Sequence, residues 1–153
     1  MKTLMTKDNF EVVQYDLIDN EDDIKKVTEY MNVHGHNALQ MREYQRAFDS
    51  RGDIIVIQNK NGDMVANMYK HDELGFHFIA DIKNIPIKDE SILSVYYEFL
   101  KESGVDNIEN VFKKTTQCYG KIDNIDDIFQ SIQSKVGVKK KNKNKTYGLL
   151  SYR

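Results

Sequence analysis

Four histidines are the side chains best suited to chemistry near neutral pH, because an imidazole gains and loses a proton in that range. His77 has the most suggestive context, since it alternates with Phe76 and Phe78 in the stretch FHF. In a strand this alternation places the imidazole on the face opposite the two aromatic rings, where it could enter a cleft. His77 is therefore the best candidate for a catalytic base, although a surface histidine without a role is the favoured interpretation.

The same histidines raise the question of a metal ion. The stretch HGH at 34–36 and the stretch HDELGFH at 71–77 could together supply imidazole nitrogens and carboxylate oxygens. Both groups are common ligands of zinc. The spacing matches no known metal motif, however, so we expect no metal site.

A run of lysines, KKKNKNK at residues 139–145, is the densest charge in the chain. Its ammonium groups could contact the phosphates of RNA, DNA or a CoA-like ligand. The alternative is a solvated hairpin tip, which also prevents sheets from joining edge to edge. Aromatic residues, which stack on unpaired bases, do not interleave the run, so nucleic acid is the less favoured partner. The candidate anion contacts are Lys139, Lys140, Lys141, Lys143 and Lys145.

Composition is typical of a globular protein. The 153 residues suit one domain spanning 1–153, and the net charge of −2 gives no general attraction to nucleic acid or to an anionic membrane. The single cysteine, Cys118, cannot form an internal disulfide, and an inert thiol is favoured over a nucleophile. No segment is apolar enough to be a signal peptide or to span a bilayer, so we expect a cytoplasmic protein.

Hydrophobic periodicity predicts both strands and helices. The clearest feature is a hairpin turn at Asn61-Gly62, because this pair supplies the positive φ angles of a tight turn. A helix beginning near Asp89 carries an apolar stripe that includes Tyr96. Because Tyr96 and Tyr97 are not expected to face inward together, one of the two should face solvent or a partner. The expected strands cover 10–17, both arms of the hairpin at 53–71, 75–85, 107–117 and two segments around the lysine run. The expected helices cover 20–32, 37–51, 89–103 with Gly104 as its stop, and 124–137 with Gly137 as its stop.

These elements follow the order β-α-α-β-β-β-α-β-α-β-β. An order of this kind predicts an α/β (α+β) protein with a mixed, largely antiparallel sheet flanked by helices. It resembles the GNAT acetyltransferase superfamily. The stretch at 42–70, REYQRAFDSRGDIIVIQNKNGDMVANMYK, is similar to that family's second helix and central hairpin, and DIFQSIQSKVGV at 127–138 is similar to its penultimate helix.

The resemblance implies an acetyl-CoA site in a loop of the pattern Gln/Arg-x-x-Gly-x-Gly/Ala. The matching segment, DIKNIPIKDES, contains no glycine. Pro86 removes a backbone donor, and Asp89 and Glu90 bring negative charge to the helix start, where it repels a phosphate. Lys83 and Lys88 are the candidate cofactor contacts if CoA binds.

The family's frequent general acid is a tyrosine in the penultimate helix. Its position here is Gln133, which cannot donate a proton usefully near neutral pH. We therefore expect a GNAT-like domain without catalysis that acts as a binding or accessory module, with a protein partner, no cofactor and no membrane contact. Abundant Lys, Asn and Ile are typical of an AT-rich genome, so an accessory protein of a bacterium or its phage is one interpretation. The alternative is an acetyl-CoA-dependent N-acyltransferase with an atypical cofactor loop.

Overall fold

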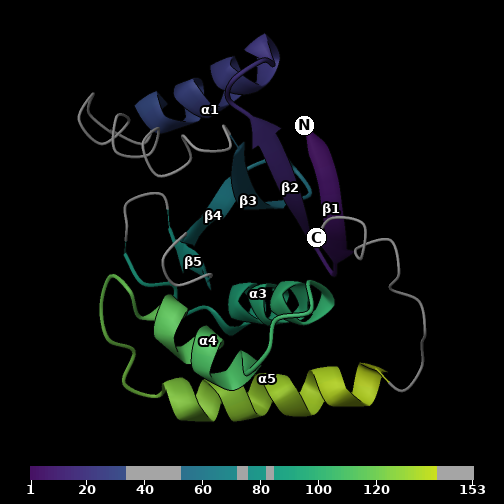
Figure 1. The fold of residues 1–153 in the computed structure, drawn as a ribbon, viewed down its shortest axis with the longest axis vertical. Helices are drawn as coiled ribbons and strands as arrows, with labels where there is room; N and C mark the ends of the chain where they lie inside the picture. The colour runs from purple at the N-terminus through teal and green to yellow at the C-terminus, as the bar shows by residue number, and fades with distance from the viewer. Residues whose placement is uncertain (34–52, 72–75, 82–84, 141–153) are drawn as a thin grey trace.

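The computed structural model describes residues 1–33, 53–71, 76–81 and 85–140. These residues form an α+β fold in which an antiparallel sheet lies between helices (Figure 1). The strands are β1 (Lys2–Lys7), β2 (Phe10–Asp16), β3 (Asp53–Asn59), β4 (Met64–His71) and β5 (Phe76–Ala80). The helices are α1 (Glu21–Val33), α3 (Glu90–Glu102), α4 (Ile108–Thr116) and α5 (Ile125–Lys140).

The strands lie in the sheet in their order along the chain, β1-β2-β3-β4-β5, and each neighbouring pair is antiparallel. The predicted hairpin turn between β3 and β4 is confirmed, because Gly62 has a φ of 87° and its N–H donates to the carbonyl of Asn59. The Asn59 side chain stabilises the turn further, since its Oδ1 accepts from the N–H groups of Asn61 and Asp63. The strand expected at 75–85 is also confirmed as β5, and it pairs antiparallel with β4.

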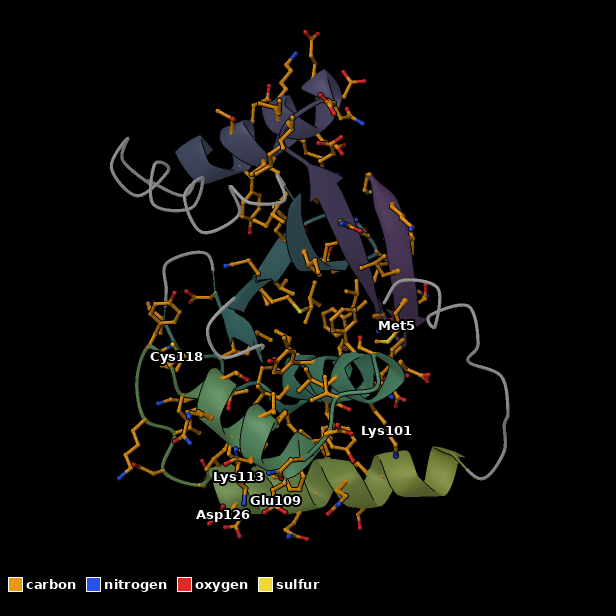
Figure 2. The ribbon with its side chains drawn as sticks, in the orientation of Figure 1. Met5, Lys101, Glu109, Lys113, Cys118 and Asp126 are labelled. Atoms are coloured by element: carbon orange, nitrogen blue, oxygen red, sulfur yellow. The ribbon has the colours of Figure 1, made fainter. Side chains whose placement is uncertain are left out.

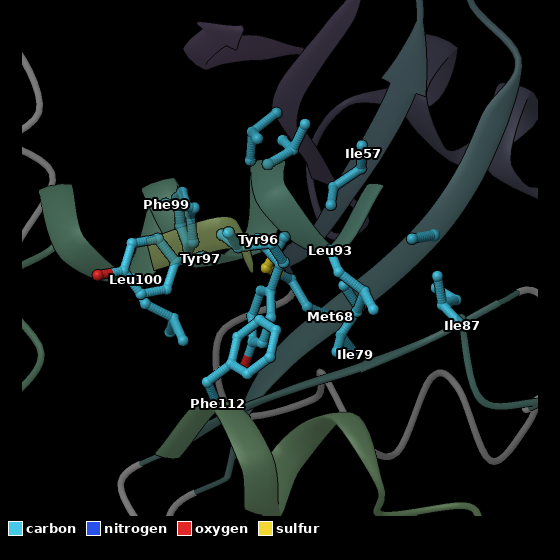
Figure 3. Packing of buried hydrophobic residues seen from close by; sticks show 14 of the residues in the cluster. Ile57, Met68, Ile79, Ile87, Leu93, Tyr96, Tyr97, Phe99, Leu100 and Phe112 are labelled. Carbon is cyan, nitrogen blue, oxygen red and sulfur yellow. The ribbon is translucent and has the colours of Figure 1, made fainter. Parts of the chain in front are cut away.

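Helices cover both faces of the sheet. In β3, Ile54 and Val56 belong to the core beneath α1, whereas Ile55 and Ile57 belong to the core shared with α3, α4 and α5. This division follows from the alternation of side chains along a strand. The core that the sheet shares with α3, α4 and α5 is the larger of the two. Helix α3 lies at its centre, between the sheet and α5 (Figures 1 and 3). The predicted first helix is confirmed as α1.

Helix α3 is buried on more than one side, which corrects the prediction that one of Tyr96 and Tyr97 faces solvent or a partner. Tyr96 is fully buried, and Tyr97 is only 3% exposed. The Tyr97 ring meets Phe112 and Phe129 edge to face, with centroid distances of 6.2 and 5.7 Å. Because α4 and α5 cover the side of α3 that a helix lying on a sheet would otherwise expose, neighbouring positions of α3 are both buried.

The stretch expected as a strand at 107–117 is instead helix α4. Its buried side chains, Val111, Phe112, Thr115 and Thr116, recur at helical spacing. Each threonine hydroxyl donates to the carbonyl four residues earlier, so these branched residues are satisfied inside the helix. The described sheet consequently contains no parallel pair, and both the expected mixed sheet and the expected element order are wrong in this region.

Two further expectations about the ends of the chain are also wrong. Strand β1 precedes the segment expected to be the first strand, which is β2. Helix α5 continues through Gly137 to Lys140, because one glycine inside a helix costs only about 1 kcal/mol and does not by itself end it. The final strands therefore do not begin directly after Gly137. The rest of that expected pair, 141–153, and the expected helix at 37–51 lie outside the described residues.

Candidate functional site

The segment that joins β5 to α3 is the candidate site, because the GNAT resemblance places a cofactor there. Asp81 and Ile85 form two hydrogen bonds with each other at its start. The Asp81 N–H donates to the Ile85 carbonyl at 3.2 Å, and the Asp81 Oδ1 accepts from the Ile85 N–H at 2.8 Å. These two bonds tie the residue that follows β5 to the segment that leads into α3.

Helix α3 begins as predicted, with Asp89 as its N-cap, and Gly104 follows its end with a left-handed φ of 75°. The Asp89 Oδ1 accepts from the N–H of Ser91 at 2.9 Å and from the Ser91 hydroxyl at 2.6 Å. The hydroxyl bond, with smaller help from backbone N–H groups, lowers the pKa of the Asp89 carboxyl. A carboxylate thus already binds the helix start, where a phosphate would accept from the same N–H groups.

Glu90, the first residue of α3, bonds to α5. Its Oε2 accepts from the Lys135 Nζ at 2.9 Å and from the Ser131 hydroxyl at 3.0 Å. These two bonds, that of Lys135 first, lower the pKa of the Glu90 carboxyl. Lys135 is 70% exposed, so solvent screens the pair and its contribution to stability is small. The start of α3 therefore carries two carboxylates, one used as a cap and one directed to the outer helix.

The Pro86 ring contacts the loop between α4 and α5. A Cβ built on Gly120 would lie 2.8 Å from the Pro86 Cγ, so only glycine fits at that position without movement. Ile85 and Tyr119, which are 52% and 39% exposed, each directly precede one residue of this contact in the chain. We refer to Ile85, Pro86 and Tyr119 as the junction patch. Grouped exposed apolar side chains are more typical of an interaction surface than single ones.

Cys118 precedes Tyr119 in the chain, lies after the end of α4 and is exposed (Figure 2). Desolvation raises the pKa of its thiol, so the thiol is protonated at neutral pH. A protonated thiol is a poor nucleophile, and this supports the interpretation of Cys118 as chemically inert.

A separate charged cluster joins α4 to α5 (Figure 2). The Lys113 Nζ lies 2.6 Å from the Glu109 carboxylate, 2.7 Å from the Asp126 carboxylate and 5.4 Å from the centre of the Phe129 ring. The hydrogen bonds that the Lys113 ammonium donates to Asp126 and Glu109 raise the pKa of Lys113. These charges pair with one another over an aromatic ring, so the cluster has the features of a contact between helices rather than of a binding site.

Few of the predicted cofactor residues can be placed at the candidate site. Lys88 is exposed on the segment that precedes α3, and Lys83 lies outside the described residues. Gln133, at the position of the family's tyrosine, is exposed on α5. Of the predicted cofactor residues, the described structure therefore places only Lys88 near the start of α3, where Asp89 caps the helix and Glu90 is already bonded to Lys135.

The other predicted residues are spread over the chain. His77 lies in β5, in register with Lys70 of β4. His71 ends β4, whereas His34 and His36 lie outside the described residues. Among the described residues, no group of three or more His, Cys, Asp or Glu side chains could hold a metal ion. Of the lysine run, Lys139 and Lys140 end α5, and Lys141, Lys143 and Lys145 are outside the described part.

The junction patch was not predicted from the sequence. Pro86 suggested only a missing backbone donor, and Gly120 carries no local signal of a partner. Their contact depends on α4 being a helix, because this helix and the loop after it bring the backbone of Gly120 to the proline. A pattern search over short windows cannot find such a pair.

Comparison with known proteins gives no match: no family model, curated protein or solved structure is significantly similar to this chain. Within the described ranges, no helix is both long and apolar enough to cross a membrane.

Proposed function

We propose that this chain is a binding module built on a GNAT-like scaffold, that it does not use acetyl-CoA, and that its partner is a protein. The observation that carries the proposal is the Asp89 carboxylate at the start of α3. It accepts the Ser91 N–H at 2.9 Å, which is one of the donors that a cofactor phosphate would need.

Electrostatics at the same place support the proposal. A pyrophosphate at the start of α3 would lie beside the charged carboxylates of Asp89 and Glu90, whose pKa values are both lowered by their hydrogen bonds. Like charges at short distance repel one another, and the positive end of the helix dipole is already used by the cap. Lys88 is too flexible and too exposed to replace a nest of backbone N–H groups.

The scaffold part of the proposal depends on the order of elements. The antiparallel run β2-β3-β4-β5, followed directly by α3, is the part that resembles the GNAT order. Helix α4 departs from that order, because the family has a strand there. The same resemblance supports the alternative, an N-acyltransferase with an atypical cofactor loop, and acetyl-CoA binding separates the two functions.

Calorimetric titration with acetyl-CoA tests the proposal directly. We expect no binding heat from the natural chain at millimolar cofactor. Micromolar binding that is lost in the double variant Lys83→Ala/Lys88→Ala would contradict the proposal and establish the acyltransferase alternative. Lys25→Ala is the matched control, because Lys25 is an exposed lysine of α1, on the other side of the sheet.

The protein partner is tested at the junction patch. The variant Ile85→Ser/Tyr119→Ser removes its two most exposed apolar side chains, and Ile18→Ser is the control because Ile18 is 58% exposed and lies after β2, away from the patch. We expect a protein that co-purifies with the natural chain to be lost from the double variant and kept by the control. Retention by both variants would place the contact elsewhere.

A further inference from the structure

We draw no further inference here: the strongest candidate, the exposed apolar junction patch of Ile85, Pro86 and Tyr119 between the β5–α3 segment and the α4–α5 loop, belongs to the site already described, and nothing in the described structure shows what covers it.

Discussion

Pro86 and Gly120 are in contact, and a Cβ at position 120 would lie 2.8 Å from the Pro86 Cγ. The two residues belong to the segment that enters α3 and to the loop that enters α5. Their contact therefore ties the start of the central helix to the outer helical layer. The hydrogen bonds from Lys135 and Ser131 of α5 to Glu90 connect the same two helices.

Gly120→Ala is expected to destabilise the protein by about 1–3 kcal/mol, because the new methyl group must displace the proline ring or the loop. Urea denaturation measures this change as a lower midpoint with an unaltered slope. In a Pro86→Ala background the Cγ is absent, so the same substitution should cost less. An equal cost in both backgrounds would show that the contact does not limit residue 120.

Asp89→Ala is expected to lower the free energy of unfolding by about 1 kcal/mol, since the Ser91 N–H loses its acceptor at the start of α3. Asp89→Asn should cost less, because asparagine is an equally good N-cap and its side-chain oxygen can accept the same bond. Denaturation of both variants under one set of conditions checks the order. If the two substitutions are equally harmful, the charge of Asp89 matters more than its capping bond.

The two carboxylates at the start of α3 should contribute to the loss of folding stability at low pH. The pKa values of Asp89 and Glu90 are lowered in the folded protein. Carboxylates with a lowered folded pKa stabilise the folded protein at pH values above their unfolded pKa, which is about 4. This stabilisation is lost as the pH falls through their folded pKa values. The double variant Asp89→Asn/Glu90→Gln should therefore lose less stability than the natural chain between about pH 5 and pH 2. Melting temperatures across this range measure the difference, and parallel curves would contradict it.

Removing the hydroxyl group of Thr115 should cost more stability than removing that of Tyr96. Their hydroxyl oxygens lie 2.7 Å apart, and Thr115 also donates to the carbonyl of Val111, so Tyr96 is the donor to Thr115. Tyr96→Phe removes that donor and is expected to cost about 0.5–1.5 kcal/mol. Thr115→Val removes the acceptor of a fully buried hydroxyl and should cost about 1–3 kcal/mol.

A double-mutant cycle tests the same pair. The variant Tyr96→Phe/Thr115→Val replaces both hydroxyl groups with apolar ones of similar shape, so its loss of stability should be smaller than the sum of the two single losses. Additive losses would mean that the two hydroxyl groups do not interact.

Local sequence signals predicted the elements whose formation depends on neighbouring residues. The Asn61-Gly62 turn, the strands beside it and the helix capped by Asp89 follow from backbone preferences, caps and periodicity over a few residues. The prediction of a strand at 107–117 was wrong because the structure of this stretch depends on residues far away in the chain. Its apolar and branched residues suit either a buried strand or a buried helix, and packing against β5, α3 and α5 selects the helix.

The sequence by itself determined that an antiparallel hairpin leads into a strand and then into a helix, that this junction has no glycine, and that carboxylates stand at the helix start. Only the tertiary structure decided that Tyr96 and Tyr97 are both buried, that Glu90 bonds to α5, and that the loop at Gly120 meets Pro86. The physical reason is that these contacts join residues far apart in the chain. They form only when α4 and α5 are packed onto α3, which no local pattern in the sequence encodes.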